Sequence, residues 1–395
     1  MVEFNPYSWE FHDDPYPTYA ALREEAPAYR NDELGFWAIS RHADVLLAFK
    51  DWETFSNAEG VALEAFSKDA WRTMSFLAMD PPSHNGLRGL VNKVFTPRRV
   101  REFEPRIRAL ANEYLDLFPA DGRVDFMESF AGKLPMDFIS EMIGVPKEDR
   151  DRVRHWVDDV LHREEGKAVV PPRAIEASLN LLQYYQAHVD QRRKQPVDDL
   201  LGALMAAEVE GRSLSDQQIL SFLFLLGVAG NETTTKLLGN ALHAAHSFPE
   251  QYEKVLADRA LIPGWVEETA RFDNSSQLVY RTLMRDIELH GKTLQKGDRV
   301  ALLIGAANRD ERVFPNPDDM DIERDFSESL SFGRGIHFCL GANLARMEGR
   351  VCCEEILRRY PRFEIDEAGL VRAHSGNVRG FVKLPVQFSA DGEAQ

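Results

Sequence analysis

Cysteine is scarce in this sequence of 395 residues, which carries it only at Cys339, Cys352 and Cys353. Two of these positions are adjacent, so a disulfide framework is excluded, and this usage is typical of a reducing compartment. The N-terminus lacks the basic and apolar segments of a secretory signal, and no apolar run approaches the ~20 residues that span a bilayer. We therefore expect a cytoplasmic protein without a membrane span.

Basic residues are also in deficit. The chain has 47 Lys and Arg residues against 64 Asp and Glu residues, which gives a formal net charge of −17. A surface with this excess of negative charge repels phosphate backbones, so we expect no nucleic-acid partner. Internal repeats, low-complexity tracts and long Pro/Gly/Ser linkers are missing as well. Their absence favours one continuous domain over residues 1–395.

Helical periodicity dominates the sequence that is present. Strand-like patterns are confined to β-rich segments at roughly 28–60, 276–305 and 379–389. The expected fold is therefore mainly α with small β-sheets. Apolar residues recur three and four positions apart in the following segments: 98–118, 149–162, 174–194, 215–246, 249–257 and 341–359.

The segment 215–246 predicts a long helix with a polar interruption. Ser215 and Gln218 match a capping box, and Pro249 disfavours helix at the residue before it. A helix of ~30 residues extends ~45 Å and must cross the middle of the protein, where an unpaired carboxylate is costly. By itself the segment is equally consistent with a close helix contact and with a functional site. The interruption comprises Gly227, Gly230, Asn231, Glu232 and Thr233 to Thr235.

A second unusual segment is FGRGIHFCLG, residues 332–341, in which glycines surround Cys339 just before another helix. Backbone N–H groups at a helix N-terminus favour a thiolate, and glycines let a flat ligand approach the backbone. No second cysteine or histidine stands at a spacing suited to zinc. A single thiolate that binds one metal indicates haem iron.

FGRGIHFCLG is similar at every specified position to the haem-binding signature of the cytochrome P450 family, and further landmarks follow in family order. AGNETT (229–234) resembles the oxygen-binding part of the central helix. EETAR (267–271) and FPNPDDMDIER (314–324) resemble the segments that contribute a structural group, here Glu268, Arg271 and Arg324. The resemblance implies the single-domain P450 fold, with haem between the long central helix and the helix after the cysteine loop.

The resemblance also implies how haem b is bound. Cys339 would be the axial ligand of the iron, and Phe332 and Gly341 would lie beside it. The haem propionates would be bound by His84, Arg88, Arg281 and His337.

On the opposite side of the haem, the resemblance implies that Ala229 and Gly230 leave space for dioxygen. Glu232 and Thr233 would form the acid–alcohol pair that relays protons. One oxygen atom from O2 would enter an apolar small molecule, by hydroxylation of a terpenoid, steroid, fatty acyl or aromatic compound. Electrons would come from a ferredoxin and its NAD(P)H-dependent reductase.

Two alternatives keep this fold but change the activity. One is a peroxygenase driven by hydrogen peroxide, and the other is a non-catalytic haem or ligand sensor. The presence of Glu232 and Thr233 argues against both.

The substrate pocket is expected to draw on the loop 61–79, the helices around 160–180, the central helix and two strand segments. The polar segment 162–174 resembles a mobile access loop. The predicted lining residues are Phe66, Phe76, Met79, Phe224, Leu225, Val228, Leu278, Val279 and Phe381.

Overall fold

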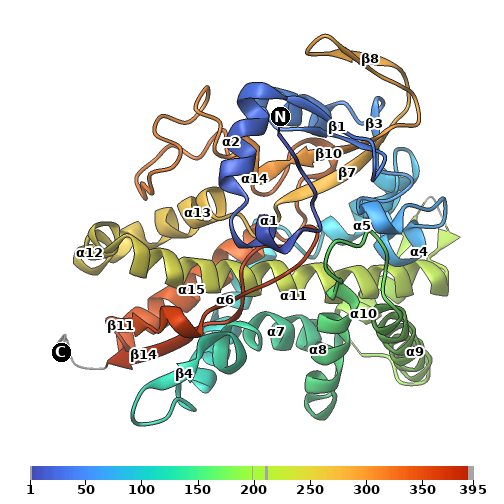
Figure 1. Cartoon of the computed structure of the whole chain (residues 1–395). Coiled ribbons are helices and arrows are strands. Elements are labelled where there is room, and N and C mark those ends of the chain that lie inside the picture. The colour runs from blue at the N-terminus through green and yellow to red at the C-terminus, as the bar shows by residue number, and fades with distance from the viewer. Residues whose placement is uncertain (1, 198, 210–211, 390–395) are drawn as a thin grey trace.

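A computed structural model describes residues 2–197, 199–209 and 212–389 of the chain (Figure 1). Helices predominate, and α11 (Asp216–Ser247) crosses the centre of the molecule, with small sheets above and below it in the view of Figure 1. The mainly α expectation is therefore confirmed. Within the described ranges, no helix is both long enough and apolar enough to cross a membrane.

The start of α11 is fixed by the expected capping box. Ser215 Oγ accepts the Gln218 N–H at 3.3 Å, and Gln218 Oε1 accepts the Ser215 N–H at 2.9 Å. These bonds satisfy N–H groups that a helix N-terminus otherwise leaves unpaired. Because α11 lies at the centre, it is packed on several sides by α4 (Trp71–Met74), α7 (Leu134–Ile143), α9 (Pro172–Lys194), α13 (Ile262–Phe272) and α15 (Ala342–Arg359).

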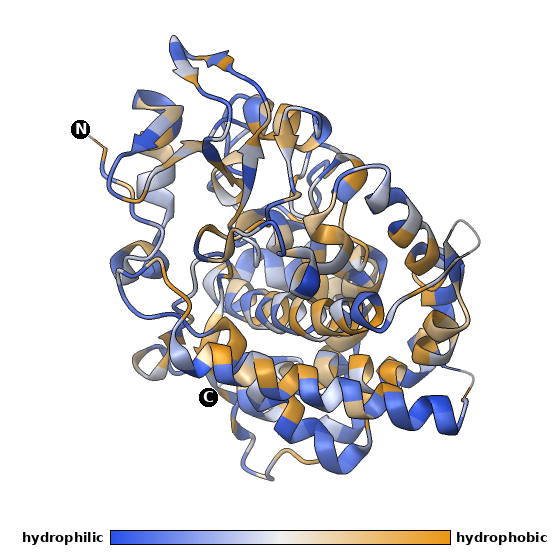
Figure 2. Ribbon diagram, turned by 90° about the vertical axis from the view of Figure 1, so that its right-hand side faces the viewer, coloured by the Kyte–Doolittle hydropathy of each residue, from blue (hydrophilic) through white to orange (hydrophobic). Residues whose placement is uncertain are grey.

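The helices predicted from periodicity match observed helices to within three residues at each end. Apolar and polar residues alternate along these helices, as the colours of Figure 2 show, and many of the apolar ones are buried in the core. Burial of the apolar stripe is what makes such helices stable in the folded protein. The other α-helices are α1 (Trp9–Asp13), α2 (Tyr16–Glu25), α3 (His42–Lys50), α5 (Ser83–Asn92), α6 (Pro97–Leu115), α8 (Lys147–Leu161), α10 (Leu200–Met205), α12 (Pro249–Ala257) and α14 (Ile304–Ala307).

The largest sheet has the strand order β1-β2-β10-β7-β3. It joins the predicted β-rich segments 28–60 and 276–305, because β2 pairs in parallel with β10 and β10 pairs antiparallel with β7. In this register Arg281 of β7 lies opposite Val300 of β10. The strands are β1 (Ala28–Asn31), β2 (Phe36–Ile39), β3 (Phe55–Ser56), β7 (Leu278–Leu283) and β10 (Arg299–Leu303).

The remaining strands form small sheets near the surface. A three-stranded sheet has the order β11-β14-β4, and three further pairs are β5-β6, β8-β9 and β12-β13. Several of these strands lie outside the predicted β-rich segments, since strands of two to four residues are too short for a readable alternation. Their bounds are β4 (Arg123–Asp125), β5 (Glu208–Val209), β6 (Arg212–Ser213), β8 (Ile287–Leu289), β9 (Lys292–Leu294), β11 (Arg362–Ile365), β12 (Val371–Arg372), β13 (Phe381–Lys383) and β14 (Pro385–Ser389).

Asp273 ties the N-terminal helices to the C-terminal part of the chain. Its Oδ1 accepts hydrogen bonds from Tyr16 Oη and Arg379 Nε, each at 2.6 Å, and its Oδ2 accepts one from Arg372 at 3.3 Å. Burial alone would raise the pKa of this carboxyl, but Arg379 and Arg372 outweigh it and hold the pKa well below its usual range. The folded state therefore stabilises the ionised form.

Replacing Asp273 with asparagine is expected to cost about 3–5 kcal/mol at pH 7, because Arg379 is then left buried without its counter-ion. The carboxylate's contribution is present above its unfolded pKa of about 4 and is lost as the pH falls toward the lower folded pKa. The wild type should therefore lose more stability than the variant on acidification. Denaturant midpoints at pH 7 and pH 3 measure this, with exposed Asp32→Asn as the control.

Candidate active site

A cavity between α11 and the start of α15 brings together the two motifs that the sequence singled out. Ala229, Gly230 and Thr233 line it from α11, and Cys339 and Gly341 line it from the loop before α15. The same cavity has a largely apolar surface. It therefore has both the groups to hold a flat prosthetic group and the space for a second ligand beside it.

The loop around Cys339 has a shape that depends on glycine. Gly333 and Gly335 have φ values of 68° and 71°, in the left-handed region that L side chains rarely adopt. The Cys339 N–H donates to the Phe332 carbonyl at 2.8 Å, which closes the loop. A Cβ on Gly341 would meet no atom within 4 Å, so a side chain there would project into open space at the cavity wall.

Cys339 is accessible from the cavity that it lines, while protein surrounds its thiol on the other sides. Burial raises the pKa of this thiol, and the N–H groups of Gly341 and Ala342 and the charge of Arg88 oppose the rise without cancelling it. A bound metal cation would supply the further stabilisation that a thiolate needs. The loop therefore fits an iron with a single thiolate ligand.

The four predicted propionate partners gather at one end of the cavity. Arg88, Arg281 and His337 line it, and the ring of His84 lies 4.4 Å from that of His337 between centroids. Nε2 of His84 and both ring nitrogens of His337 are buried without a hydrogen-bond partner. Buried polar atoms are nearly always paired, so this end of the cavity lacks an acidic group that would accept these hydrogen bonds.

Two of these side chains show how strongly the cavity disfavours unpaired charge. Burial lowers the pKa of Arg281 to about 10, and its guanidinium donates to the Tyr280 carbonyl at 2.7 Å. Burial, followed by the charge of Arg281, lowers the pKa of His337 to about 2. A pair of carboxylates would relieve both effects, so the residues present fit the propionates of haem.

On the α11 side, the Thr233 hydroxyl donates to the Ala229 carbonyl at 3.0 Å and faces the cavity. Gly230 lies against α7: a Cβ there would be 3.3 Å from Ile139 Cδ1. Its missing side chain therefore permits close packing of the two helices, which is the structural alternative that the sequence left open. Glu232 lies outside the cavity lining and forms an ion pair with Lys236 at 3.2 Å.

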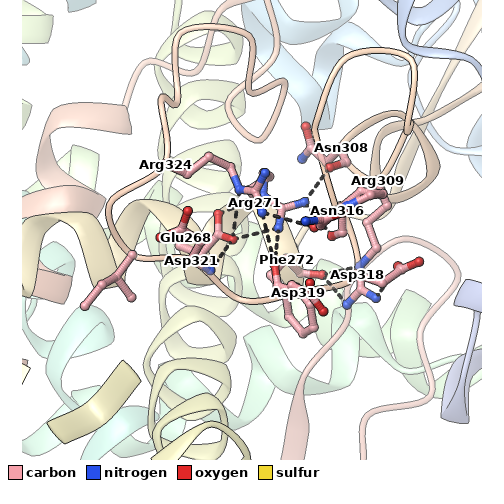
Figure 3. Close-up of polar contacts among 12 residues, drawn as sticks. Glu268, Arg271, Phe272, Asn308, Arg309, Asn316, Asp318, Asp319, Asp321 and Arg324 are labelled. Atoms are coloured by element: carbon pink, nitrogen blue, oxygen red, sulfur yellow. Dashed lines mark hydrogen bonds and ion pairs between the residues drawn. The ribbon is translucent and has the colours of Figure 1, made fainter. Parts of the chain in front are cut away.

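Glu268, Arg271 and Arg324 form a buried group, whose side chains Figure 3 shows close together. Arg271 binds Glu268 through two hydrogen bonds of 2.7 Å, and Arg324 Nε lies 3.3 Å from Glu268 Oε1. Arg271 also donates to the carbonyls of Asn308 and Pro317, at 2.8 and 2.9 Å. The group thus fixes the long loop that leads toward Cys339.

Three predicted pocket residues, Phe76, Leu225 and Val279, line the cavity. The others are placed differently, because the sequence did not show which face of each element points inward. Leu278 precedes Val279 on β7 and so points to the opposite face, into the N-terminal core. The residues outside the lining are Phe66, Met79, Phe224, Val228, Leu278 and Phe381.

Phe381 and Phe66 have other partners. Phe381 packs against the ring of His243, with centroids 4.9 Å apart, and lies under Arg372. Phe66 packs under the guanidinium of Arg299, which lies 4.6 Å from its ring centroid. These contacts make both side chains part of the core and not of the cavity.

The cavity also contains polar residues that the sequence reasoning missed. Asn274, Ser275 and Ser276 line it from the turn between α13 and β7. Glu348 lines it from α15, and burial raises the pKa of its carboxyl to about 8 while the Thr234 hydroxyl opposes the rise. The sequence did contain a signal for Glu348. This carboxylate stands four residues after Leu344 and therefore on the same, apolar face of the predicted helix.

The segment 162–174 is anchored in this structure. Arg163 Nε donates to Glu64 Oε1 at 2.6 Å, and Tyr7 Oη donates to Glu64 Oε2 at 2.7 Å. The Gly166 N–H donates to the Tyr7 carbonyl at 2.9 Å. These bonds connect the segment to the loop 61–79 and to the N-terminus, and no residue of 160–180 lines the cavity.

The fold and the site together are those of a class of protein that binds haem between a long central helix and a loop with one cysteine, whose thiolate ligates the iron. The sequence model of the family cytochrome P450 matches residues 173–389. A protein of Mycobacterium tuberculosis named cytochrome P450 123 is 53% identical over 389 residues, which are 98% of this chain and 97% of its own. Vitamin D(3) 25-hydroxylase of Pseudonocardia autotrophica is 38% identical over 394 residues, 96% of this chain and 95% of its own.

Among solved structures, the bacillaene polyketide synthase cytochrome P450 PksS of Bacillus subtilis has a TM-score of 0.90 at 34% identity. That comparison covers 98% of this chain and 100% of PksS. The chain belongs to the cytochrome P450 family. It is a haem-thiolate monooxygenase, an oxidoreductase that acts on small molecules with electrons from redox partner proteins.

Proposed function

We propose that this enzyme contains haem b and hydroxylates an apolar small molecule of the terpenoid, steroid, fatty acyl or aromatic class. A ferredoxin and its NAD(P)H-dependent reductase would supply the electrons. The observation that carries the proposal is the cavity itself. It joins a thiol, Cys339, to a group of unpaired buried donors around His337 and to an apolar wall that includes Phe76 and Leu225.

Haem, when bound, supplies the oxygen and electron chemistry, and the side chains of the cavity bind and orient it. Cys339 would ligate the iron, and the aromatic side chain of Phe332, with Arg346 4.3 Å from its ring centroid, would shield the thiolate edge. The propionates would be neutralised by His84, Arg88, Arg281 and His337, whose buried nitrogens would then be paired.

The composition of the cavity supports an apolar substrate with few polar groups. Its wall carries Phe76, Leu225, Val279 and Ile139, and burial of such surfaces against a ligand is favourable. The turn Asn274 to Ser276 could hydrogen-bond a hydroxyl or carbonyl oxygen of the ligand. Two relatives whose names mention vitamin D(3) and a polyketide are consistent with a large carbon skeleton.

The experiment that tests this function compares two routes to product. Purified holoenzyme is supplied either with NAD(P)H, a surrogate ferredoxin and its reductase, or with hydrogen peroxide alone. Candidate substrates are first chosen by their displacement of the iron's water, read as a spin-state change. Product that requires peroxide, or none from any compound that shifts the spin state, would contradict the proposal.

Replacing Thr233 with alanine is expected to uncouple NAD(P)H consumption from product formation. Thr233 lines the cavity, and its hydroxyl is the only polar group of its side chain. A side chain positioned to transfer a proton contributes about 10²–10⁴-fold to the rate of a proton-transfer step. We expect product per NAD(P)H to fall at least ~10-fold while NAD(P)H is still consumed. The control is Thr235→Ala, because Thr235 donates to the Ala131 carbonyl within the core. Full coupling in Thr233→Ala would show that this hydroxyl is not part of a relay.

A further inference from the structure

Lys236 lies in the C-terminal half of the central helix α11, one turn after Glu232. Lys236 Nζ is 3.2 Å from Glu232 Oε2, and the two side chains are only 8% and 15% exposed. The same ammonium donates to the Phe381 carbonyl of β13 at 2.9 Å. A lysine is rarely buried without a paired partner, so these two contacts account for its presence in an otherwise apolar helix.

The surrounding backbone accommodates this lysine. A Cβ at Gly380 would lie 2.5 Å from Lys236 Cβ and 2.8 Å from its Cγ, so only glycine leaves room for the aliphatic stem. The stem is therefore held against the strand, and the carbonyl of Phe381 fixes the ammonium at its end. As a result Glu232 has a charged partner in a fixed position on its own helix face.

A third charged side chain completes the cluster. Asp158 of α8 lies within electrostatic range of Glu232 and Lys236, and Arg154 and His155 of the same helix also act on it. Local desolvation and then the charge of Glu232 raise the pKa of Asp158 to about 6, while Lys236 opposes the rise. On the β13 side the group facing Lys236 is an uncharged carbonyl. Asp158 thus takes up a proton more readily than an isolated aspartate does, because desolvation and the charge of Glu232 both disfavour its ionised form.

The place of Glu232, Lys236 and Asp158 relative to the cavity indicates a role in proton transfer. Thr233 faces the cavity, whereas Glu232 and Lys236 lie one helical stripe away, toward α8. Asp158 remains exposed, so it can exchange protons with water. A proton path from solvent to the cavity would therefore run through Asp158, Glu232 and Thr233, with Lys236 beside Glu232.

We propose that Lys236 is a positioning residue for Glu232 and that, together with Asp158, it sets the pH range in which Glu232 passes protons toward Thr233. This proposal rests on the acid–alcohol pair of the proposed function. Lys236 holds the Glu232 side chain in a fixed orientation, and Asp158 takes up the replacing proton from water. Removing the ammonium should favour protonation of the cluster, and removing Asp158 should disfavour it.

The test measures coupling against pH for three variants of the holoenzyme. In Lys236→Gln the fall in coupling at high pH should move up by about 1–3 pH units, the shift expected when an adjacent opposite charge is lost. In Asp158→Asn the same limb should move down. The matched control is Asp159→Asn, whose carboxylate pairs with Arg173, and its profile should equal that of the wild type.

A second measurement does not depend on turnover. The infrared band of a protonated carboxyl should titrate near pH 6 in the wild type, move to higher pH in Lys236→Gln and disappear in Asp158→Asn. Opposite shifts in the two variants cannot come from a loss of stability common to both. Asp158 lies on the surface helix α8, so its variant remains informative if Lys236→Gln folds poorly.

The outcomes separate this inference from the function on which it rests. If Glu232→Gln leaves coupling intact, the acid–alcohol relay is wrong, and this proposal fails with it. If Glu232→Gln uncouples but Lys236→Gln and Asp158→Asn keep the wild-type pH profile and infrared titration, the relay stands and the positioning role of Lys236 is overturned.

Discussion

Replacing Arg271 with methionine is expected to remove about 3–5 kcal/mol of folding free energy, because the buried Glu268 carboxylate loses the two short hydrogen bonds of its principal partner and keeps only the longer contact with Arg324. Both side chains are fully buried, and two hydrogen bonds of 2.7 Å join them. A loss of this size is a large share of the 5–15 kcal/mol that stabilises a typical domain. The variant should therefore be recovered in low soluble yield and bind little haem.

The control for this variant is Lys254→Met. Lys254 pairs with Glu323 at 2.8 Å, but the two side chains are 43% and 55% exposed. Exposed pairs contribute at most about 1 kcal/mol, so its denaturant midpoint should lie close to that of the wild type. Equal losses in the two variants would mean that the buried group around Arg271 has no special role in stability.

Replacing Cys339 with alanine is expected to abolish turnover supported by NAD(P)H and to remove the thiolate signature from the carbon monoxide difference spectrum of the reduced protein. The reason is that Cys339 is the one cysteine in the cavity, while Cys352 and Cys353 are buried in the core with raised pKa values. Activity should fall by more than the ~10–100-fold that loss of an outer-shell partner causes at metal sites.

Cys352→Ala is the matched control for Cys339→Ala. Its side chain is fully buried on α15, so the substitution removes a small apolar group without touching the cavity. We expect a modest loss of stability and an unchanged spectrum. A thiolate spectrum that persists in Cys339→Ala would refute the assignment of the axial ligand.

Local features of this protein were readable in the sequence because they depend on neighbours along the chain. The capping box of Ser215 and Gln218 needs only residues three apart, and it is formed as predicted. The pairing of Glu268 with Arg271 likewise follows from their spacing on one helix. The glycines around Cys339 indicated an unusual loop, and two of them have positive φ.

Contacts between distant segments were not readable in this way. Gly230 lines the cavity, where it was predicted to leave space for dioxygen, but the sequence did not show that Ile139 from another helix would lie 3.3 Å from a Cβ at this position. Nothing near Lys236 in the sequence indicated that it would donate to the Phe381 carbonyl or that its charge would act on Asp158. Each of these contacts depends on how whole helices and strands pack, and packing is a property of the complete core.

The sequence by itself determined the helices, their ends and the residues of the cysteine loop, since periodicity, capping and backbone restrictions are local. Only the tertiary structure decided which face of each element lines the cavity. On β7 a single residue separates Val279 in the lining from Leu278 in the core, because neighbouring side chains of a strand point to opposite faces. The inward face is chosen by the elements packed on either side, and these come from distant parts of the chain.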